Sequence, residues 1–191
     1  AYVIPSRPAG SPAVLTPYQV QTRDRIIGMH LGVGRVAIHG WKRFYKNATY
    51  HPRLWEVEKY IELAQKMQAY DSDIRLAIIG TRNEAFLGRQ FAGEVPGTID
   101  LIGKTTVSDL KSLMGEIELF VSGDSGVLHI AASEPIPLVA LFGPTLPSEN
   151  GPWPQQPWHR VLKKDAMADY SVEEVYQAVV ASLEQVPAAT G

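Results

Sequence analysis

Short apolar runs and amphipathic stretches alternate along this chain. Residues 74–80 read IRLAIIG, a run with the length and composition of a buried strand. Residues 55–70 instead carry Val57, Tyr60 and Ala64 at spacings of three and four, with charged residues between them, which is typical of an amphipathic helix. The two patterns recur. They predict strands at 25–31, 74–80, 99–102, 117–121 and 137–142, and helices at 55–70, 85–92, 105–114, 127–133 and 171–185.

Strands that alternate with helices, without hairpin signals between them, indicate βαβ units. We therefore predict an α/β fold, a Rossmann-like parallel sheet with helices on both faces. Residues 1–24 are rich in proline and predict a linker or strap without regular structure, 25–186 form the packed domain, and 187–191 are a tail. Residues 35–53 are basic and aromatic without a period, so we expect an irregular loop. The last helix is expected to open with a capping box, SVEE at 171–174.

The composition excludes several classes of function. The 191 residues include no cysteine, which excludes thiolate catalysis, CxxC redox chemistry and cysteine-bound zinc. The formal net charge of −2 argues against a protein that mainly neutralises nucleic-acid phosphates, so any phosphate must be held locally. No apolar run approaches the roughly 20 residues of a membrane span. The first 17 residues lack the features of a secretory signal, and the chain begins without methionine, as a cut or processed fragment would.

The segment VSGDSGVLH at 121–129 predicts a strand, a glycine-containing turn and the start of a helix. Ligands of open α/β sheets bind at the carboxyl ends of strands, where this turn lies. Free N–H groups around Ser125, Gly126 and Val127 would point from the helix N-terminus toward an anion such as a diphosphate. Asp124 would repel a diphosphate, so it is better suited to cap the helix or to bind a hydroxyl. The alternative is a merely well-capped helix, with His129 as an ordinary structural residue.

Three further segments follow strands or feed the same sheet edge. His30 and Gly32 come after the first strand, and Gly32 allows close approach of a ligand to the backbone. Arg53 is the preferred cation of the basic loop, because a guanidinium binds phosphate in bidentate fashion. Thr145 belongs to FGPT at 142–145, which either walls a nucleotide pocket or simply ends a strand. The rival cations in the loop are Lys42, Arg43 and Lys46.

We expect no protein-bound metal. The five histidines show neither HExxH nor another close ligand spacing. Asp71 and Asp73 look like the DxD of metal-dependent sugar transferases. They precede their strand, however, which puts them at the opposite edge of the sheet and predicts a turn.

Four blocks of the sequence share their order and spacing with one protein family. They are IDLIGKTT at 99–106, DSGVLHIAA at 124–132, ALFGPT at 140–145 and NGPW at 150–153. On these blocks the chain resembles the heptosyltransferases of glycosyltransferase family nine, over about residues 25–183. The match is to the carboxyl-terminal, donor-binding half of that family's two-domain GT-B architecture.

The resemblance implies a function and roles for single residues. The family transfers heptose from ADP-heptose to the inner core of lipopolysaccharide, with inversion and without a metal in the site. The implied partners are therefore a nucleotide sugar and a glycan or glycolipid acceptor, with no cofactor, and the implied location is cytoplasmic, at the inner face of the bacterial inner membrane. Glu84 matches a family acid that contacts the ribose, and Arg53 stands where the family usually has a lysine that meets the diphosphate. The positions implied to line the nucleotide-sugar site are Asp124, Ser125, Gly126, Val127 and His129.

The chain departs from the family pattern in four respects, two of which are the arginine at position 53 and a longer loop before Trp55. HLGV at 30–33 replaces the family's HPGA, and the amino-terminal domain, which binds the acceptor and holds the proposed catalytic base, is absent. We therefore expect the chain alone not to transfer sugar. Two other functions remain open. One is a noncatalytic module that binds a nucleotide sugar or assists assembly, and the other is a sugar-nucleotide epimerase of GT-B type, which the FGPT block disfavours.

Overall fold

A parallel sheet of six strands forms the centre of the computed structural model, which describes residues 13–32 and 52–185. The strand order is β3-β2-β1-β4-β5-β6, and every neighbouring pair is parallel. This architecture confirms the predicted α/β, Rossmann-like fold. The strands are Arg25–His30 (β1), Ile74–Ile79 (β2), Ile99–Asp100 (β3), Leu119–Gly123 (β4), Leu138–Phe142 (β5) and His159–Lys163 (β6).

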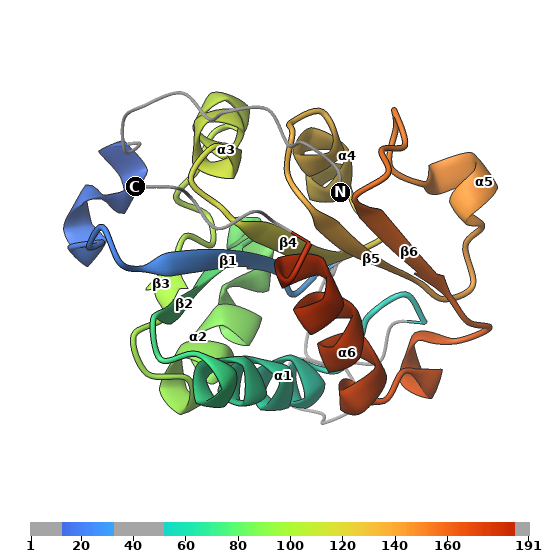
Figure 1. Cartoon of the computed structure of the whole chain (residues 1–191), viewed down its shortest axis with the longest axis horizontal. Helices are drawn as coiled ribbons and strands as arrows, with labels where there is room; N and C mark the ends of the chain where they lie inside the picture. Colours follow the sequence, from blue (N-terminus) through green and yellow to red (C-terminus); the bar gives the residue numbers. More distant parts are fainter. Residues whose placement is uncertain (1–12, 33–51, 186–191) are drawn as a thin grey trace.

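Helices cover both faces of the sheet (Figure 1). On one face α1, α2 and α6 pack on side chains that include Ile27 and Met29 of β1. On the other face α3 and α4 pack on a second core that includes Ile26. Successive side chains of a strand point to opposite faces, so β1 contributes to both cores. The helices are Val57–Tyr70 (α1), Ala85–Glu94 (α2), Val107–Met114 (α3), Gly126–Ala132 (α4), Pro147–Asn150 (α5) and Val172–Leu183 (α6).

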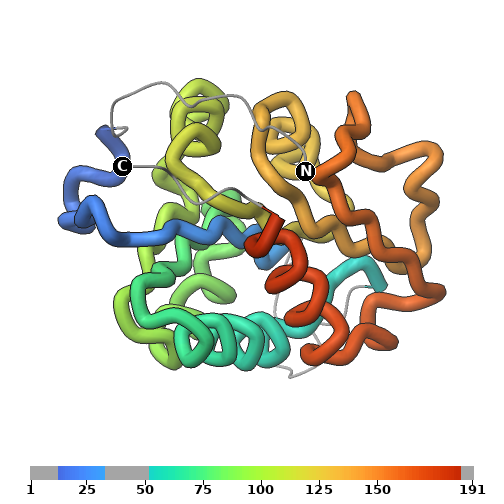
Figure 2. The backbone as a smooth tube through the Cα atoms, viewed as in Figure 1, coloured from blue at the N-terminus to red at the C-terminus, as the bar shows by residue number. Residues whose placement is uncertain are grey.

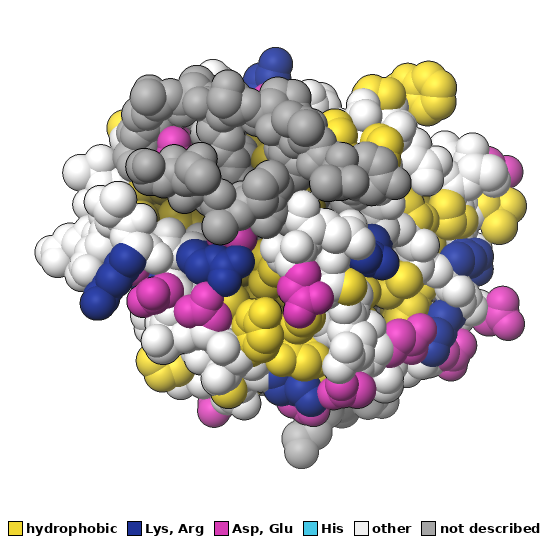
Figure 3. Space-filling view, in the orientation of Figure 1, with side chains coloured by type: hydrophobic (Ala, Val, Ile, Leu, Met, Phe, Trp, Pro, Cys, Tyr) yellow, Lys and Arg dark blue, Asp and Glu magenta, His cyan; other side chains and the backbone are white. Residues whose placement is uncertain are grey.

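The path of the backbone brings two helices that are distant in the sequence together on one face of the sheet. Figure 2 shows α6, the last helix, beside α1, the first one, and their side chains share one core cluster. On the face seen in Figure 3, basic and acidic side chains lie interspersed among apolar ones. Within residues 13–32 and 52–185, no helix is both long and apolar enough to cross a bilayer. The predicted tail at 187–191 lies outside the described residues.

Capping side chains define where several helices begin. Thr106 accepts a hydrogen bond from the amide of Asp109, whose carboxylate accepts from the amide of Thr106, and together they form a complete capping box before α3. At α6 half of the predicted box forms. Ser171 accepts from the amide of Glu174, but the Glu174 carboxylate binds Nζ of Lys164 at 2.5 Å. A lysine brought in by the fold therefore takes the place of the local partner.

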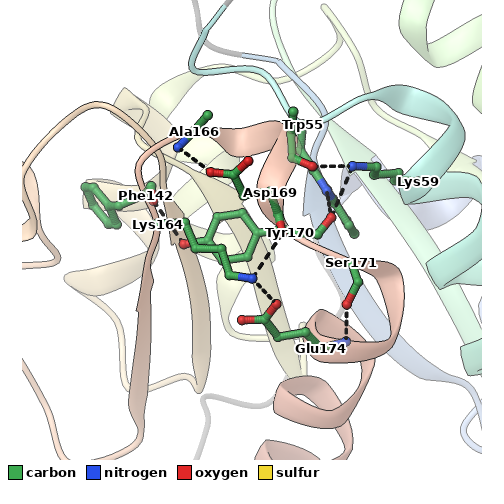
Figure 4. Close-up of polar contacts among 10 residues, drawn as sticks. Trp55, Lys59, Phe142, Lys164, Ala166, Asp169, Tyr170, Ser171 and Glu174 are labelled. Atoms are coloured by element: carbon green, nitrogen blue, oxygen red, sulfur yellow. Dashed lines mark hydrogen bonds and ion pairs between the residues drawn. The ribbon is translucent and has the colours of Figure 1, made fainter.

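The connection between β6 and α6 crosses back to the end of β5 (Figure 4). The Tyr170 hydroxyl donates to the Phe142 carbonyl at 2.9 Å. The Tyr170 carbonyl in turn accepts from Nε1 of Trp55 at 3.3 Å and from Nζ of Lys59 at 3.1 Å. Since Trp55 and Lys59 lie at the start of α1, this connection joins the carboxyl end of β5 to the segment that carries Arg53.

The amino-terminal segment is more ordered than the sequence predicts. Residues Ala13–Tyr18 form a 3-10 helix (η1), where we expected a linker without regular structure. Leu15 is buried in the core cluster beneath α3 and α4, and the Tyr18 hydroxyl donates to the carbonyl of Asp100. The prediction is wrong here because burial of one leucine and one long-range hydrogen bond hold a sequence that has no helical period of its own.

Strand β6 is a second departure from the prediction, which has no strand there. Its burial is partial, since it pairs with β5 on one side and forms the edge of the sheet. An edge strand needs few apolar residues, and this one has just Val161 and Leu162 after a proline-rich stretch. The pattern of apolar positions therefore carried too little signal.

Candidate functional site

The strand order reverses between β1 and β4. From β1 the chain builds β2 and β3 on one side, and then β4, β5 and β6 on the other. Ligands of such sheets bind outside the carboxyl ends of the strands at this reversal. His30 ends β1 and is the register partner of Ser122, near the end of β4. The predicted strand at 117–121 is thus shifted by two residues, which brings Ser122 and Gly123 into β4.

A chain of buried polar side chains crosses this edge of the sheet. Nδ1 of His30 lies 3.0 Å from Oγ of Ser125, and Nε2 lies 3.4 Å from Oε1 of Glu84. Oγ of Ser125 also lies 3.1 Å from Oγ of Ser122. The exposed fractions are 1% for His30 and Glu84, 7% for Ser125 and 0% for Ser122. Buried polar groups need partners, and here the two serines and Nδ1 of His30 supply them to one another. Nε2 of His30 makes no hydrogen bond among the described residues and has only the Glu84 carboxylate within ion-pair distance.

Two glycines make room for the Glu84 carboxylate. A Cβ atom built on Gly32 would stand 1.7 Å from Oε1 of Glu84, and one built on Gly80 would stand 2.8 Å from Oε2. The Thr81 amide and hydroxyl donate to Oε2 at 2.6 and 3.0 Å. Gly32, predicted as a point of close approach for a ligand, is thus a point of close approach for a side chain of this chain.

Arg53 and Asp124 form an ion pair beside this buried chain. Nη1 of Arg53 lies 3.3 Å from Oδ2 of Asp124, and their side chains are 36% and 9% exposed. Leu54 and Trp55, which follow Arg53, are buried, and the hydrogen bond from Trp55 to Tyr170 holds this segment against the β6–α6 connection (Figure 4). The guanidinium predicted to meet a diphosphate is therefore fixed at one end and partly open to solvent.

The start of α4 differs in one respect from the prediction. Ser125, and not Asp124, is the residue that caps the helix, because its Oγ accepts from the Leu128 amide at 3.3 Å. The Asp124 carboxylate is left to pair with Arg53. A Cβ atom built on Gly126 would meet no atom of residues 13–32 and 52–185 within 4 Å, so these residues leave the space beside it open.

The other predicted site residues lie on the elements that follow β4 and β5. Val127 is half-buried, and His129 has an exposed side chain on α4. Thr145 follows β5, and its Oγ1 is buried without a hydrogen-bond partner in the described part of the chain. The rival cations Lys42, Arg43 and Lys46 lie outside the described residues.

Asp71 and Asp73 lie at the amino edge of the sheet, as predicted. Asp71 accepts from the Asp73 amide at 2.9 Å and pairs with Arg25 at 2.6 Å. The amide and the guanidinium hold the pKa of the Asp71 carboxyl below its ordinary value. Among the residues that the structure describes, no three histidine, aspartate or glutamate side chains gather as a metal site would require.

Sequence reasoning missed three residues that build this edge: Ser122, Gly80 and Thr81. Ser122 was taken for part of a turn, and no local pattern shows that it faces Ser125. Thr81 could have been found, because Thr-x-x-Glu at 81–84 has the spacing of a capping box. Gly80 could not have been found, because its contact with the Glu84 carboxylate forms only when the turn at 80–84 folds.

Comparison with known proteins gives a consistent result. The model of glycosyltransferase family 9 (heptosyltransferase) matches residues 41–179, well over half of the chain. Lipooligosaccharide heptosyltransferase 2 of Haemophilus influenzae is 30% identical over 117 residues, an alignment that spans 57% of this chain and 33% of that protein.

Two solved structures share the fold. E. coli ADP-heptose lipopolysaccharide heptosyltransferase II superposes with a TM-score of 0.71 at 22% identity. A glycosyl transferase family 9 protein of Veillonella parvula superposes with a TM-score of 0.74 at 19% identity. Each match covers 90% of this chain and 50% of the other, so this chain spans about half the length of these proteins.

Proposed function

Since this chain belongs to glycosyltransferase family 9, the heptosyltransferase family, we propose that it is the donor-binding part of a sugar transferase. The nucleotide sugar binds at the carboxyl ends of β1 and β4. The observation that carries this proposal is the gathering of Arg53, Glu84 and the pair Asp124–Ser125 at that one edge, from three separate segments of the chain.

The diphosphate of the donor binds between Arg53 and the start of α4. The guanidinium of Arg53 is partly exposed and can form charge-assisted hydrogen bonds to phosphate oxygens. The space beside Gly126 is open, so oxygens can approach the backbone there. The hydroxyl of Thr145, which has no hydrogen-bond partner among the residues that the structure describes, is a further donor at the same edge. Glu84, at the end of β2, serves the ribose side of the nucleotide.

The donor is ADP-heptose, and the acceptor is a glycan of the lipopolysaccharide type. Support for this choice comes from the names of the similar proteins, since the E. coli structure is that of an ADP-heptose enzyme and the Haemophilus relative is a lipooligosaccharide heptosyltransferase. Asp124 lies next to the diphosphate site and can accept a hydrogen bond from a sugar hydroxyl.

The transfer inverts the anomeric carbon. An acceptor hydroxyl attacks this carbon on the face opposite the diphosphate, the C–O bond to the diphosphate breaks, and a base takes the hydroxyl proton. Negative charge grows on the departing ADP, and a preorganised cation and N–H groups stabilise it. Arg53 and the amides at the start of α4 fill this role without a metal ion. The base and the acceptor site belong to the half of the family's architecture that this chain does not span.

Calorimetric titration of this chain with ADP, UDP and GDP tests the proposal. We expect ADP to bind most tightly and EDTA to leave its affinity unchanged. Arg53→Ala should weaken ADP binding by about tenfold or more, because a charge-assisted contact to phosphate is lost.

Arg23→Ala is the matched control. It removes an equal charge from the amino edge, where Arg23 is 71% exposed and lies 3.9 Å from Asp73. A folded chain that binds none of the three nucleotides, or an equal loss of affinity in both arginine variants, would overturn the proposed site.

A further inference from the structure

We propose that His30 is a positioning residue for this donor site: its ring holds the Ser125 hydroxyl and the Glu84 carboxylate at a set distance and does not touch the substrate. The inference rests on the proposed function and departs from the sequence-based expectation that His30 binds substrate. His30 is 1% exposed, and each ring nitrogen faces a residue from a different strand end.

The partners of the ring determine where its proton lies. The Glu84 carboxylate can act only as an acceptor. We therefore assign a hydrogen to Nε2, which lies 3.4 Å from Oε1 and makes no hydrogen bond among the described residues. In a neutral ring Nδ1 is then the acceptor, and the Ser125 hydroxyl donates to it at 3.0 Å. The Ser122 hydroxyl donates to the Gly123 carbonyl at 2.8 Å, so in this arrangement its 3.1 Å contact with Oγ of Ser125 contains no hydrogen, because each hydroxyl has only one.

This arrangement orients both neighbours of the ring. With its hydrogen directed at His30, Ser125 keeps its lone pairs for the Leu128 amide and so caps α4. Glu84 is held from the other side by Thr81 and by the close backbone of Gly32 and Gly80. Loss of the ring would therefore loosen both the start of α4 and the Glu84 carboxylate, although both are distant from His30 in the sequence.

Glutamate, histidine and serine in a row are also the residue types of a nucleophilic triad. Three observations favour positioning over nucleophilic chemistry. Ser125 is 7% exposed, its oxygen caps a helix, and its backbone is extended at φ −157° and ψ 162°. The strained turn that presents a nucleophilic serine above a sheet is absent at this residue. A serine-directed phosphonate should therefore leave Ser125 unlabelled.

The first test reads the ring itself. Nitrogen NMR of the histidine rings in the parent chain reports which nitrogens of His30 carry hydrogen, with Ser125→Ala and Glu84→Gln used to assign the two contacts. A hydrogen on Nε2, alone or with a second on Nδ1, supports the proposal. A bare Nε2, or phosphonate labelling of Ser125, overturns it.

The second test measures ADP affinity in a set of His30 variants. His30→Leu removes both contacts, whereas His30→Asn and His30→Gln each place an amide near one of the two nitrogens. We expect a loss of about tenfold for leucine and about threefold for each amide, at a temperature at which all variants are folded. This graded rescue is not expected if the ring only fills space.

The control is His159→Asn, which alters another buried histidine at the opposite end of the sheet and should leave ADP affinity unchanged. If the parent binds ADP and His30→Leu binds it equally well, the positioning role fails and the proposed function stands. If the parent binds no nucleotide, both fail.

Discussion

The guanidinium of Arg53 lies 3.3 Å from the carboxylate of Asp124, at the edge where the strand order reverses. A cation proposed to meet a diphosphate is thus paired with an anion in the same place. The pair holds the guanidinium at the mouth of the site, but it also puts a negative charge beside the position of the phosphates. Which effect is larger can be measured.

We expect repulsion to dominate for ADP, so that Asp124→Asn raises its affinity about threefold to tenfold at low salt. The substitution removes a charge beside the proposed diphosphate position while it keeps an oxygen near Arg53. Because charge interactions at a partly exposed site are screened, the gain should shrink as salt is added. Titration of ADP at two salt concentrations checks this. Asp73→Asn, at the amino edge, is the control, and weaker binding in Asp124→Asn would show instead that the pair is needed to hold Arg53.

Gly32→Ala should destabilise the chain by about 1–3 kcal/mol and weaken ADP binding. The added methyl group would stand 1.7 Å from Oε1 of Glu84, so the carboxylate must leave its place beside His30. Chemical denaturation measures the first effect and calorimetry the second. Gly93→Ala is the matched control. It lies in α2 with nothing within 4 Å of the new methyl group, and should raise the free energy of unfolding by up to about 1 kcal/mol. Equal stabilities of the two variants would contradict the proposed crowding at Gly32.

The parallel sheet could be predicted because its strands are short apolar runs that local sequence reveals. β6 and η1 could not be predicted, because each is held by long-range contacts: β6 by pairing with β5, and η1 by packing on the core beneath α3. The carboxyl end of β4 is an intermediate case. Ser122 and Gly123 resemble a turn, but the Ser122 hydroxyl finds its partners within the fold and so tolerates complete burial.

That three of the predicted residues lie at one edge of the sheet was predictable for a similar reason. His30 ends a strand, Glu84 and Ser125 follow strands, and parallel strands end at one edge. Their pairing was not predictable, because it depends on the register that sets His30 opposite Ser122 and on the turn that folds Glu84 back over Gly80. Of the two roles predicted for Asp124, helix cap or hydroxyl partner, the first is wrong. Two capping residues stand side by side, and the backbone brings Ser125 to the Leu128 amide.

Tyr170→Phe should lower the free energy of unfolding by about 1 kcal/mol at neutral pH, because the hydrogen bond to the Phe142 carbonyl is lost (Figure 4). Burial raises the pKa of Tyr170 from 10.0 to about 12. The folded state thus holds the phenol proton more tightly than the unfolded state does. The stabilisation is complete below pH 10 and is lost as the pH rises toward 12.

Urea denaturation of the parent and of Tyr170→Phe across this alkaline range checks the prediction. The parent should lose stability more steeply than the variant. Burial also raises the pKa of Tyr60, so some alkaline loss must persist in Tyr170→Phe. Parallel curves for the two proteins would contradict the role given to the Tyr170 hydroxyl.

His159 should make the chain sensitive to acid. Its side chain is 7% exposed, and burial lowers its pKa from 6.5 to about 4. Between these two pKa values the unfolded state therefore binds a proton at His159 that the folded state does not bind. The stability is complete above pH 6.5 and falls as the pH drops toward 4, by up to about 3 kcal/mol.

His159→Asn keeps an acceptor for the Gln156 amide, which in the parent donates to Nδ1 at 3.2 Å, but asparagine cannot titrate. Denaturation between pH 7.5 and 4 should show a flatter curve for this variant than for the parent. His129→Asn, which alters an exposed histidine, should follow the parent. If His159→Asn follows it as well, carboxylates such as Asp71, whose pKa is lowered in the folded state, account for the acid sensitivity instead.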